Sequence, residues 1–186
     1  MDPAYKLSRR GFLQASIAMA AAAGAGVGCE AGATPWRFFS VDEARTLAAI
    51  CDQIIPPDGD PGAAWAGVVN YIDRQLSGPL ASLRNSYRLG LAAVDHNSRT
   101  LHSNPFPDAT PIQQIELLRR MERGQAPSEP WKQITSIEFF TLVLDHTMQG
   151  FYGDPRHGGN REGISWKILG IPYPPIRGRF RPEFKS

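Results

Sequence analysis

The sequence predicts an all-α domain of about five helices, followed by a long irregular C-terminal arm. Apolar residues recur every three or four positions in successive stretches, and runs that alternate polar and apolar residues are nearly absent. Connectors of ordinary length separate the stretches, which favours a small orthogonal or bundle-like packing of helices. The predicted order is a removable segment over residues 1–33, the helical domain over 34–149 and the arm over 150–186.

The first helix is predicted to begin after Ser40, because Ser40 and Glu43 have the spacing of a capping box. The prolines at 56–57 end it, since proline lacks the amide hydrogen that a helix interior requires. Helical spacing also predicts a second helix over residues 63–76 and a third that follows Gly78. The apolar residues of the three helices are Leu47, Ile50, Cys51, Ile54 and Ile55, then Val68, Val69, Ile72 and Leu76, and then Leu80, Leu83, Tyr87, Leu91 and Val94.

The fourth helix is predicted to begin after Thr110, with Pro111 at its first position and Gln113 completing a capping box. A fifth helix over residues 131–149 follows, and Gly150 is interpreted as its stop. We expect one apolar stripe on each helix to face the core. The stripes are Ile112, Ile115, Leu118 and Met121 on the fourth helix, and Ile134, Ile137, Phe140, Leu144 and Met148 on the fifth.

The arm over residues 150–186 is expected to be extended, because it is rich in Gly and Pro and shows no helical repeat. It carries too many large apolar residues for a disordered tail. Two compatible interpretations follow: the arm packs over its own helices, or part of it lies on a partner protein. The anchors of such a contact would be Tyr152, Trp166 and Tyr173. The full set of residues predicted to contact a partner is Phe151, Tyr152, Asp154, His157, Asn160, Trp166 and Tyr173.

Residues 1–33 have the layout of a twin-arginine export signal, an address for folded proteins. An arginine pair precedes an Ala- and Gly-rich apolar stretch over about 15–28, which is too short to span a membrane with roughly 20 apolar residues. Small residues at 31–33 then predict cleavage before Thr34 and a periplasmic mature chain. The residues that carry the signal are Arg9, Arg10, Phe12 and Leu13.

Cys29 leaves an alternative at the end of the signal. Cleavage before Cys29 with lipidation of its sulfur would attach the protein to the periplasmic face of a membrane. If cleavage follows Ala33 instead, Cys51 is the one cysteine of the mature chain. Cys51 is then interpreted as a small buried residue, with a disulfide to another subunit as the alternative.

The composition of the mature chain excludes some classes of function. Residues 34–186 contain 17 basic and 16 acidic residues, so the domain is close to neutral and has no basic stripe for nucleic acid. The sequence lacks a nucleotide-binding glycine motif, a haem-attachment motif and cysteine sets for zinc or iron–sulfur clusters. His157 with Asp154 is the best acid–base pair, and such a pair in a turn is more often a hydrogen-bonding staple. We therefore predict no catalytic, cofactor-binding or metal residue in this chain.

Two stretches of the chain resemble the gluconate 2-dehydrogenase subunit 3 family. The first consists of residues 39–44 (FSVDEA), 52–57 (DQIIPP), 61–63 (PGA) and the helix over 69–76. The second consists of residues 150–155 (GFYGDP), 158–160 (GGN) and 166–172 (WKILGIP), and it is the more specific of the two. With the export signal, the resemblance spans most of the mature chain.

The resemblance implies a non-catalytic small subunit of a periplasmic FAD-dependent sugar, sugar-acid or glycoside dehydrogenase. In such complexes a flavoprotein of the glucose–methanol–choline class holds FAD, and a multihaem cytochrome c subunit often takes the electrons onward. The small subunit binds the flavoprotein and supplies the export signal, so membrane association comes through the complex. It has no catalytic residues to carry over, and the substrate, electron acceptor and stoichiometry stay open. The alternatives are a stand-alone exported binding protein or lipoprotein, and an enzyme that uses His157 and Asp154.

Overall fold

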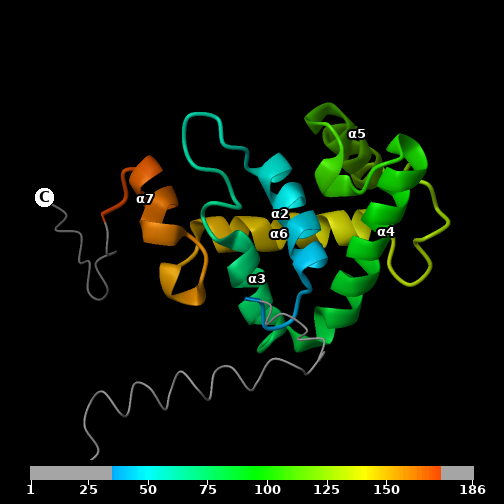
Figure 1. Ribbon diagram of the computed structural model, residues 1–186. Helices are drawn as coiled ribbons and strands as arrows, with labels where there is room; N and C mark the ends of the chain where they lie inside the picture. The colour runs from blue at the N-terminus through cyan, green and yellow to red at the C-terminus, as the bar shows by residue number, and fades with distance from the viewer. Residues whose placement is uncertain (1–34, 173–186) are drawn as a thin grey trace, which may run out of the picture. The chain divides into compact units, whose positions relative to one another are not determined.

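The computed structural model describes residues 35–172 (Figure 1). The predicted export signal, Cys29 and Tyr173 lie outside the described residues. Within them the chain forms six α-helices and no strand, which confirms the all-α class. The helices are α2 (Val41–Ile54), α3 (Val68–Leu76), α4 (Arg84–His102), α5 (Pro111–Glu122), α6 (Ser136–Tyr152) and α7 (Ile164–Ile168). Short 3₁₀ turns occur at Ala81–Leu83, Phe106–Asp108, Pro155–His157 and Arg161–Gly163.

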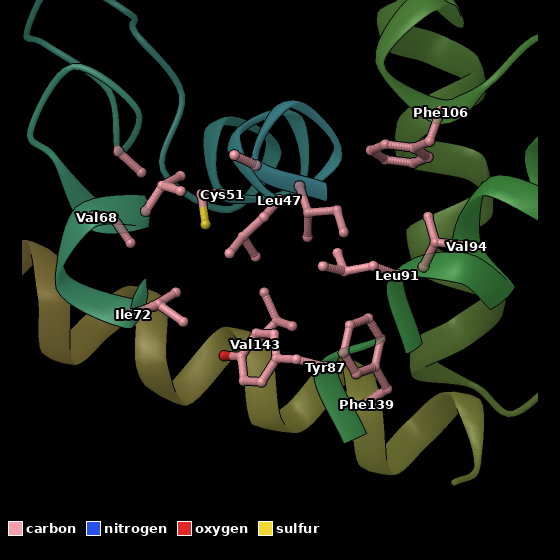
Figure 2. Packing of buried hydrophobic residues seen from close by; sticks show 14 of the residues in the cluster. Leu47, Cys51, Val68, Ile72, Tyr87, Leu91, Val94, Phe106, Phe139 and Val143 are labelled. Atoms are coloured by element: carbon pink, nitrogen blue, oxygen red, sulfur yellow. The ribbon is translucent and has the colours of Figure 1, made fainter. Parts of the chain in front are cut away.

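Helix α2 occupies the centre of the core and contacts α3, α4, α5 and α6. Its inward side chains Leu47, Ile50 and Cys51 are completely or almost completely buried. Figure 2 shows Leu47 and Cys51 pointing toward Tyr87 of α4 and Val143 of α6. The apolar stripes predicted for α2 and α3 are both confirmed, because the predicted residues of α3 are buried as well: Val68, Val69, Ile72 and Leu76. On α4, the predicted residues Tyr87, Leu91 and Val94 are also buried.

Capping boxes fix the beginnings of three helices. The predicted box at Ser40 is confirmed, with Ser40 Oγ accepting from the Glu43 amide at 3.1 Å. The box of Thr110 with Gln113 is confirmed as well. A third box, in which Thr135 caps α6 and pairs with Glu138, escaped the sequence analysis because we expected that helix to begin at residue 131.

Several predicted boundaries were wrong. Residues 63–67 form a turn, and α3 begins only at Val68 because Gly67 adopts a left-handed conformation with φ 79°. Helix α4 begins at Arg84, after a 3₁₀ turn. Gly150 does not stop α6, which continues to Tyr152. Gly150 instead faces Tyr71 of α3, where there is no room for a larger side chain.

The predicted core stripe of α5 is confirmed only at Leu118 and Met121, and the residues predicted for α6 are at most partly buried. On α5 the buried residues are Gln114, Leu117, Leu118 and Met121, whereas Ile112 is 79% exposed. On α6 the core takes Phe139, Val143, His146 and Thr147, whereas Ile137 and Met148 are 46% and 42% exposed. Polar residues occupy core positions on both helices, so counting apolar residues selected a face displaced from the buried one.

The C-terminal arm is not extended within the described residues. After α6 the chain makes two 3₁₀ turns and the short helix α7, and Gly158 and Gly163 take left-handed conformations between them. Glycine reaches these conformations without the steric cost of a Cβ atom. The Gly-rich composition that suggested an extended arm therefore serves a series of tight turns.

A buried carboxylate fixes the beginning of the described chain. Asp73 on α3 is 2% exposed, and its oxygens accept hydrogen bonds from the backbone amides of Arg37, Phe38 and Phe39 at 2.8, 2.9 and 3.2 Å. These three amides precede α2 and have no helical partner of their own. Asp73 thus attaches the entry segment of the fold to the middle of the helical domain.

We expect Asp73→Ala to lower the free energy of unfolding by about 3–5 kcal/mol, because it leaves several buried amide donors without an acceptor. Asp73→Asn keeps one acceptor oxygen and should cost less. Urea titrations followed by circular dichroism measure both values. A loss below about 1 kcal/mol for Asp73→Ala would show that water replaces the carboxylate.

A buried polar pair lies between α4 and α6. The Tyr87 hydroxyl and His146 Nδ1 share a hydrogen bond of 2.8 Å, and their rings are parallel, with centroids 5.9 Å apart. Tyr87 is fully buried and His146 is 6% exposed. Burial lowers the pKa of His146 below its ordinary value, and the charge of Asp145 opposes this shift only in part.

This shift predicts a loss of stability in mild acid. The folded pKa of His146 is the lower one, so the unfolded chain takes up the proton first as the pH falls. The contribution is complete above the ordinary histidine pKa of about 6.5 and declines as the pH falls through that value toward the folded pKa. Urea titrations of wild type and His146→Gln between pH 8 and 5 should give a smaller pH slope for the variant. Equal slopes would contradict a role for His146.

Candidate partner-binding surface

The segment after α6 is held against α3 and α6 by a set of backbone contacts. Gly159 packs so closely on α6 that a Cβ atom there would overlap the Gly150 carbonyl oxygen. The Arg161 amide donates to the Ala66 carbonyl at 2.9 Å, and Asn70 Nδ2 donates to the Gly158 carbonyl at 2.7 Å. The position of the segment is therefore determined by two helices at once.

Asn160 closes this segment on itself. Its side chain is fully buried, with Nδ2 donating to the Gly153 carbonyl at 2.8 Å and Oδ1 accepting from the Ser165 amide at 3.0 Å. The second bond fixes the first turn of α7. In this position Asn160 adopts a positive φ of 44°, a left-handed conformation that Asn tolerates better than most residues.

The structure separates the residues predicted to contact a partner. Phe151 is 3% exposed and belongs to the core, and Asn160 is buried as described above. Tyr152 is 41% exposed and His157 is exposed. Asp154 and Trp166 are half-buried, and Trp166 Nε1 donates to the Tyr152 carbonyl at 3.0 Å. The predicted contact residues that are solvent-accessible in the described chain are thus Tyr152, Asp154, His157 and Trp166.

Asp154 acts as a turn staple in the structure. Its carboxylate accepts from the backbone amide of Arg156 at 3.0 Å and from Arg156 Nε at 3.1 Å. The His157 amide donates to the backbone carbonyl of Asp154. These contacts match the interpretation of Asp154 and His157 as a hydrogen-bonded turn, and they give no support to an acid–base pair.

Several exposed apolar side chains occur on the last turns of α6 and at the end of α7. Met148 and Tyr152 lie one helical turn apart on α6 and are 42% and 41% exposed. Ile168, Leu169 and Ile171, at and after the end of α7, are 43%, 57% and 42% exposed. Helices α6 and α7 are in contact. We call these five residues the α6–α7 surface.

The sequence analysis placed three aromatic anchors in this region and did not select Ile168, Leu169 or Ile171 as contacts. Their exposure depends on how α7 docks, which no local pattern reveals. Grouped exposed apolar residues typically mark contacts with another protein or a membrane.

A second apolar surface lies on α5, away from α7 (Figure 1). Ile112 and Ile115 line an open groove of about 620 Å³ together with Arg119, Arg120 and Arg123. A neighbouring groove of about 400 Å³ is floored by apolar residues of α2, α5 and α6. Arginine side chains border both grooves, so basic and apolar groups are mixed on this surface.

Cys51 is enclosed in the core. It is fully buried, its sulfur lies 3.3 Å from Thr147 Oγ1, and burial raises the pKa of its thiol to about 12. A disulfide with another subunit would require α2 to leave the core, so that alternative is wrong. The interpretation of Cys51 as a small buried residue is confirmed.

Among residues 35–172, no cluster of three or more His, Cys, Asp or Glu side chains could hold a metal ion. Over the same residues, no helix has the length and apolar character needed to cross a membrane.

Comparison with known proteins agrees with the resemblance seen in the sequence. The family model described as gluconate 2-dehydrogenase subunit 3 matches residues 41–172, from the first residue of α2 to the end of the described chain. No curated protein and no solved structure matches the chain. The matched range covers well over half of the sequence, and the chain therefore belongs to the gluconate 2-dehydrogenase subunit 3 family.

Proposed function

We propose that this chain is a non-catalytic small subunit of a periplasmic, FAD-dependent sugar, sugar-acid or glycoside dehydrogenase. Family membership makes it an accessory subunit of a dehydrogenase complex. The proposal adds that its partner is a flavoprotein of the glucose–methanol–choline class, which holds FAD, and that a cytochrome c subunit with haem joins the complex. The twin-arginine signal at Arg9 and Arg10 would carry the folded pair across the membrane.

The α6–α7 surface is the observation that carries this proposal. An accessory subunit has to bury part of its surface against its partner, and a specific interface buries at least about 1,200 Å² in total. The α6–α7 surface combines a Tyr anchor with four aliphatic side chains on a segment held rigidly by two helices. A rigid apolar surface loses little conformational entropy on binding.

Binding of this surface would stabilise both partners by mass action, since a ligand that binds only the folded state favours that state. Export in the folded form then gives the small subunit a second role. The export signal would be used only after the flavoprotein has folded around its cofactor. Neither binding the flavoprotein nor carrying the export signal requires a reactive group in the small subunit.

The first experiment is to purify the chain from the periplasmic and membrane fractions through a C-terminal tag, in cells that also express the neighbouring genes. We expect a co-purifying chain of dehydrogenase size and the absorption bands of a bound flavin. A colourless single chain would contradict the proposal and favour a stand-alone exported binding protein.

We expect Ile168→Asp combined with Leu169→Asp to weaken the complex by about 3 kcal/mol or more, because two apolar side chains at the interface become charged. Ile112→Asp on α5 is the matched control, since Ile112 is 79% exposed and lies outside the α6–α7 surface. Point variants are preferable to deleting the segment, because Phe151 belongs to the core.

Gel filtration and surface binding assays measure the strength of the complex, and circular dichroism checks that each variant folds. The opposite result, in which Ile112→Asp breaks the complex and the double variant does not, would move the interface to α5.

A further inference from the structure

A hollow of about 500 Å³, lined by both polar and apolar groups, lies beside the segment that leads into α7. Three parts of the chain form its walls: the entry segment at 35–36, helix α3 with Gly67 before it, and the turns between residues 155 and 162. The side chains and backbone that matter most for its chemistry are Trp36, Asn70, Arg74, Gly158, Arg161 and Glu162. Its last wall residues directly precede α7 in the chain.

Two cationic side chains line this hollow without a carboxylate partner. Within residues 35–172, neither Arg74 nor Arg161 takes part in an ion pair. Arg161 instead lies over the ring of Trp65, 5.3 Å from its centroid. The Nε atom of Arg74 is buried and has no hydrogen-bond acceptor there. A guanidinium keeps its charge at any physiological pH, so this pair creates a positive potential that Glu162 in the wall offsets only in part.

Two non-glycine residues in or next to the wall opposite α3 have strained, left-handed backbone conformations. Glu162 has a φ of 57°, and Asn160 two residues earlier has a φ of 44°. Non-glycine residues keep such conformations only where the surroundings enforce them, and they cluster at binding sites. Here the buried side chain of Asn160 and the Arg161–Ala66 backbone bond enforce them. The hollow is therefore held in one shape before any ligand arrives.

We propose that this hollow receives a carboxylate of the dehydrogenase large subunit, an inference that rests on the proposed function. The guanidinium fork matches a carboxylate in geometry and charge. Glu162 places a negative charge in the wall, which disfavours a dianion such as phosphate more than a single carboxylate. Trp36 and Pro155 supply apolar walls for the stem of an acidic side chain. The hollow then forms the polar part of the interface whose apolar part is the α6–α7 surface.

A zero-length cross-link tests this contact directly. In the complex purified with Arg161→Lys, a carbodiimide should couple the introduced amine to an Asp, a Glu or the C-terminus of the large subunit, and peptide mass spectrometry locates the bond. Arg119→Lys on α5 is the matched control and should give no such product. An intact complex without a cross-link from position 161 would overturn the inference.

Affinity measurements provide a second, independent test. Arg74→Gln combined with Arg161→Gln should weaken binding to the large subunit at least tenfold at low salt, whereas Arg119→Gln should change it less than twofold. Unchanged affinity in the double variant would overturn the inference and leave the proposed function standing. If the wild-type chain binds no flavoprotein, the proposed function fails and the inference fails with it. Tight binding of inorganic phosphate to the isolated chain, lost in the double variant, would assign the hollow to a free anion instead.

Discussion

The contact between Gly159 and Gly150 is the constraint on which the outer face of this domain depends. Two backbones meet there at a distance that excludes even a methyl group. Gly150 also brings α6 close to Tyr71 of α3, so one glycine serves two contacts. From that point the chain can only turn outward, and Asn160 and Arg161 direct it into α7. The location of the exposed apolar residues follows from this backbone geometry rather than from their own packing.

The domain thus combines a buried core around a central helix with large apolar side chains that stay exposed at its surface. Helix α2 is surrounded by four helices, and the buried polar groups Asp73 and His146 have partners within the fold. Large side chains such as Leu169 remain exposed at one end, where the described chain has no further element to cover them. A protein built in this way folds around its own core and then gains stability from association. That behaviour suits an accessory subunit better than an enzyme.

The sequence predicted correctly those features that depend on residues close together in the chain, such as helix caps. The caps at Ser40 and Thr110 depend on residues three positions apart, and both were correct. The predicted face of α5 was wrong at Ile112 and Ile115, because Gln114 enters the core through hydrogen bonds to Gln53 of α2 and to the Phe106 carbonyl. The candidate surface was predicted only in outline, since the exposure of Leu169 and the burial of Asn160 both depend on how the last turns dock. Tertiary contacts of this kind leave no periodic trace in a sequence.

The hydrogen bonds that Asp73 makes to residues 37–39 would also limit the length of free chain next to an export signal, if the predicted signal is cut after Ala33. For a signal that ends at Ala33, as the sequence predicts, only three residues separate the cleavage site from the first clamped amide. An extended stretch of that length spans roughly 11 Å. A peptidase that cut such a signal would therefore have to work almost against the surface of a finished fold. Breaking the hydrogen bonds to Asp73 would lengthen the free chain, so the speed of signal removal would become a measure of how firmly the first residues of the domain are held.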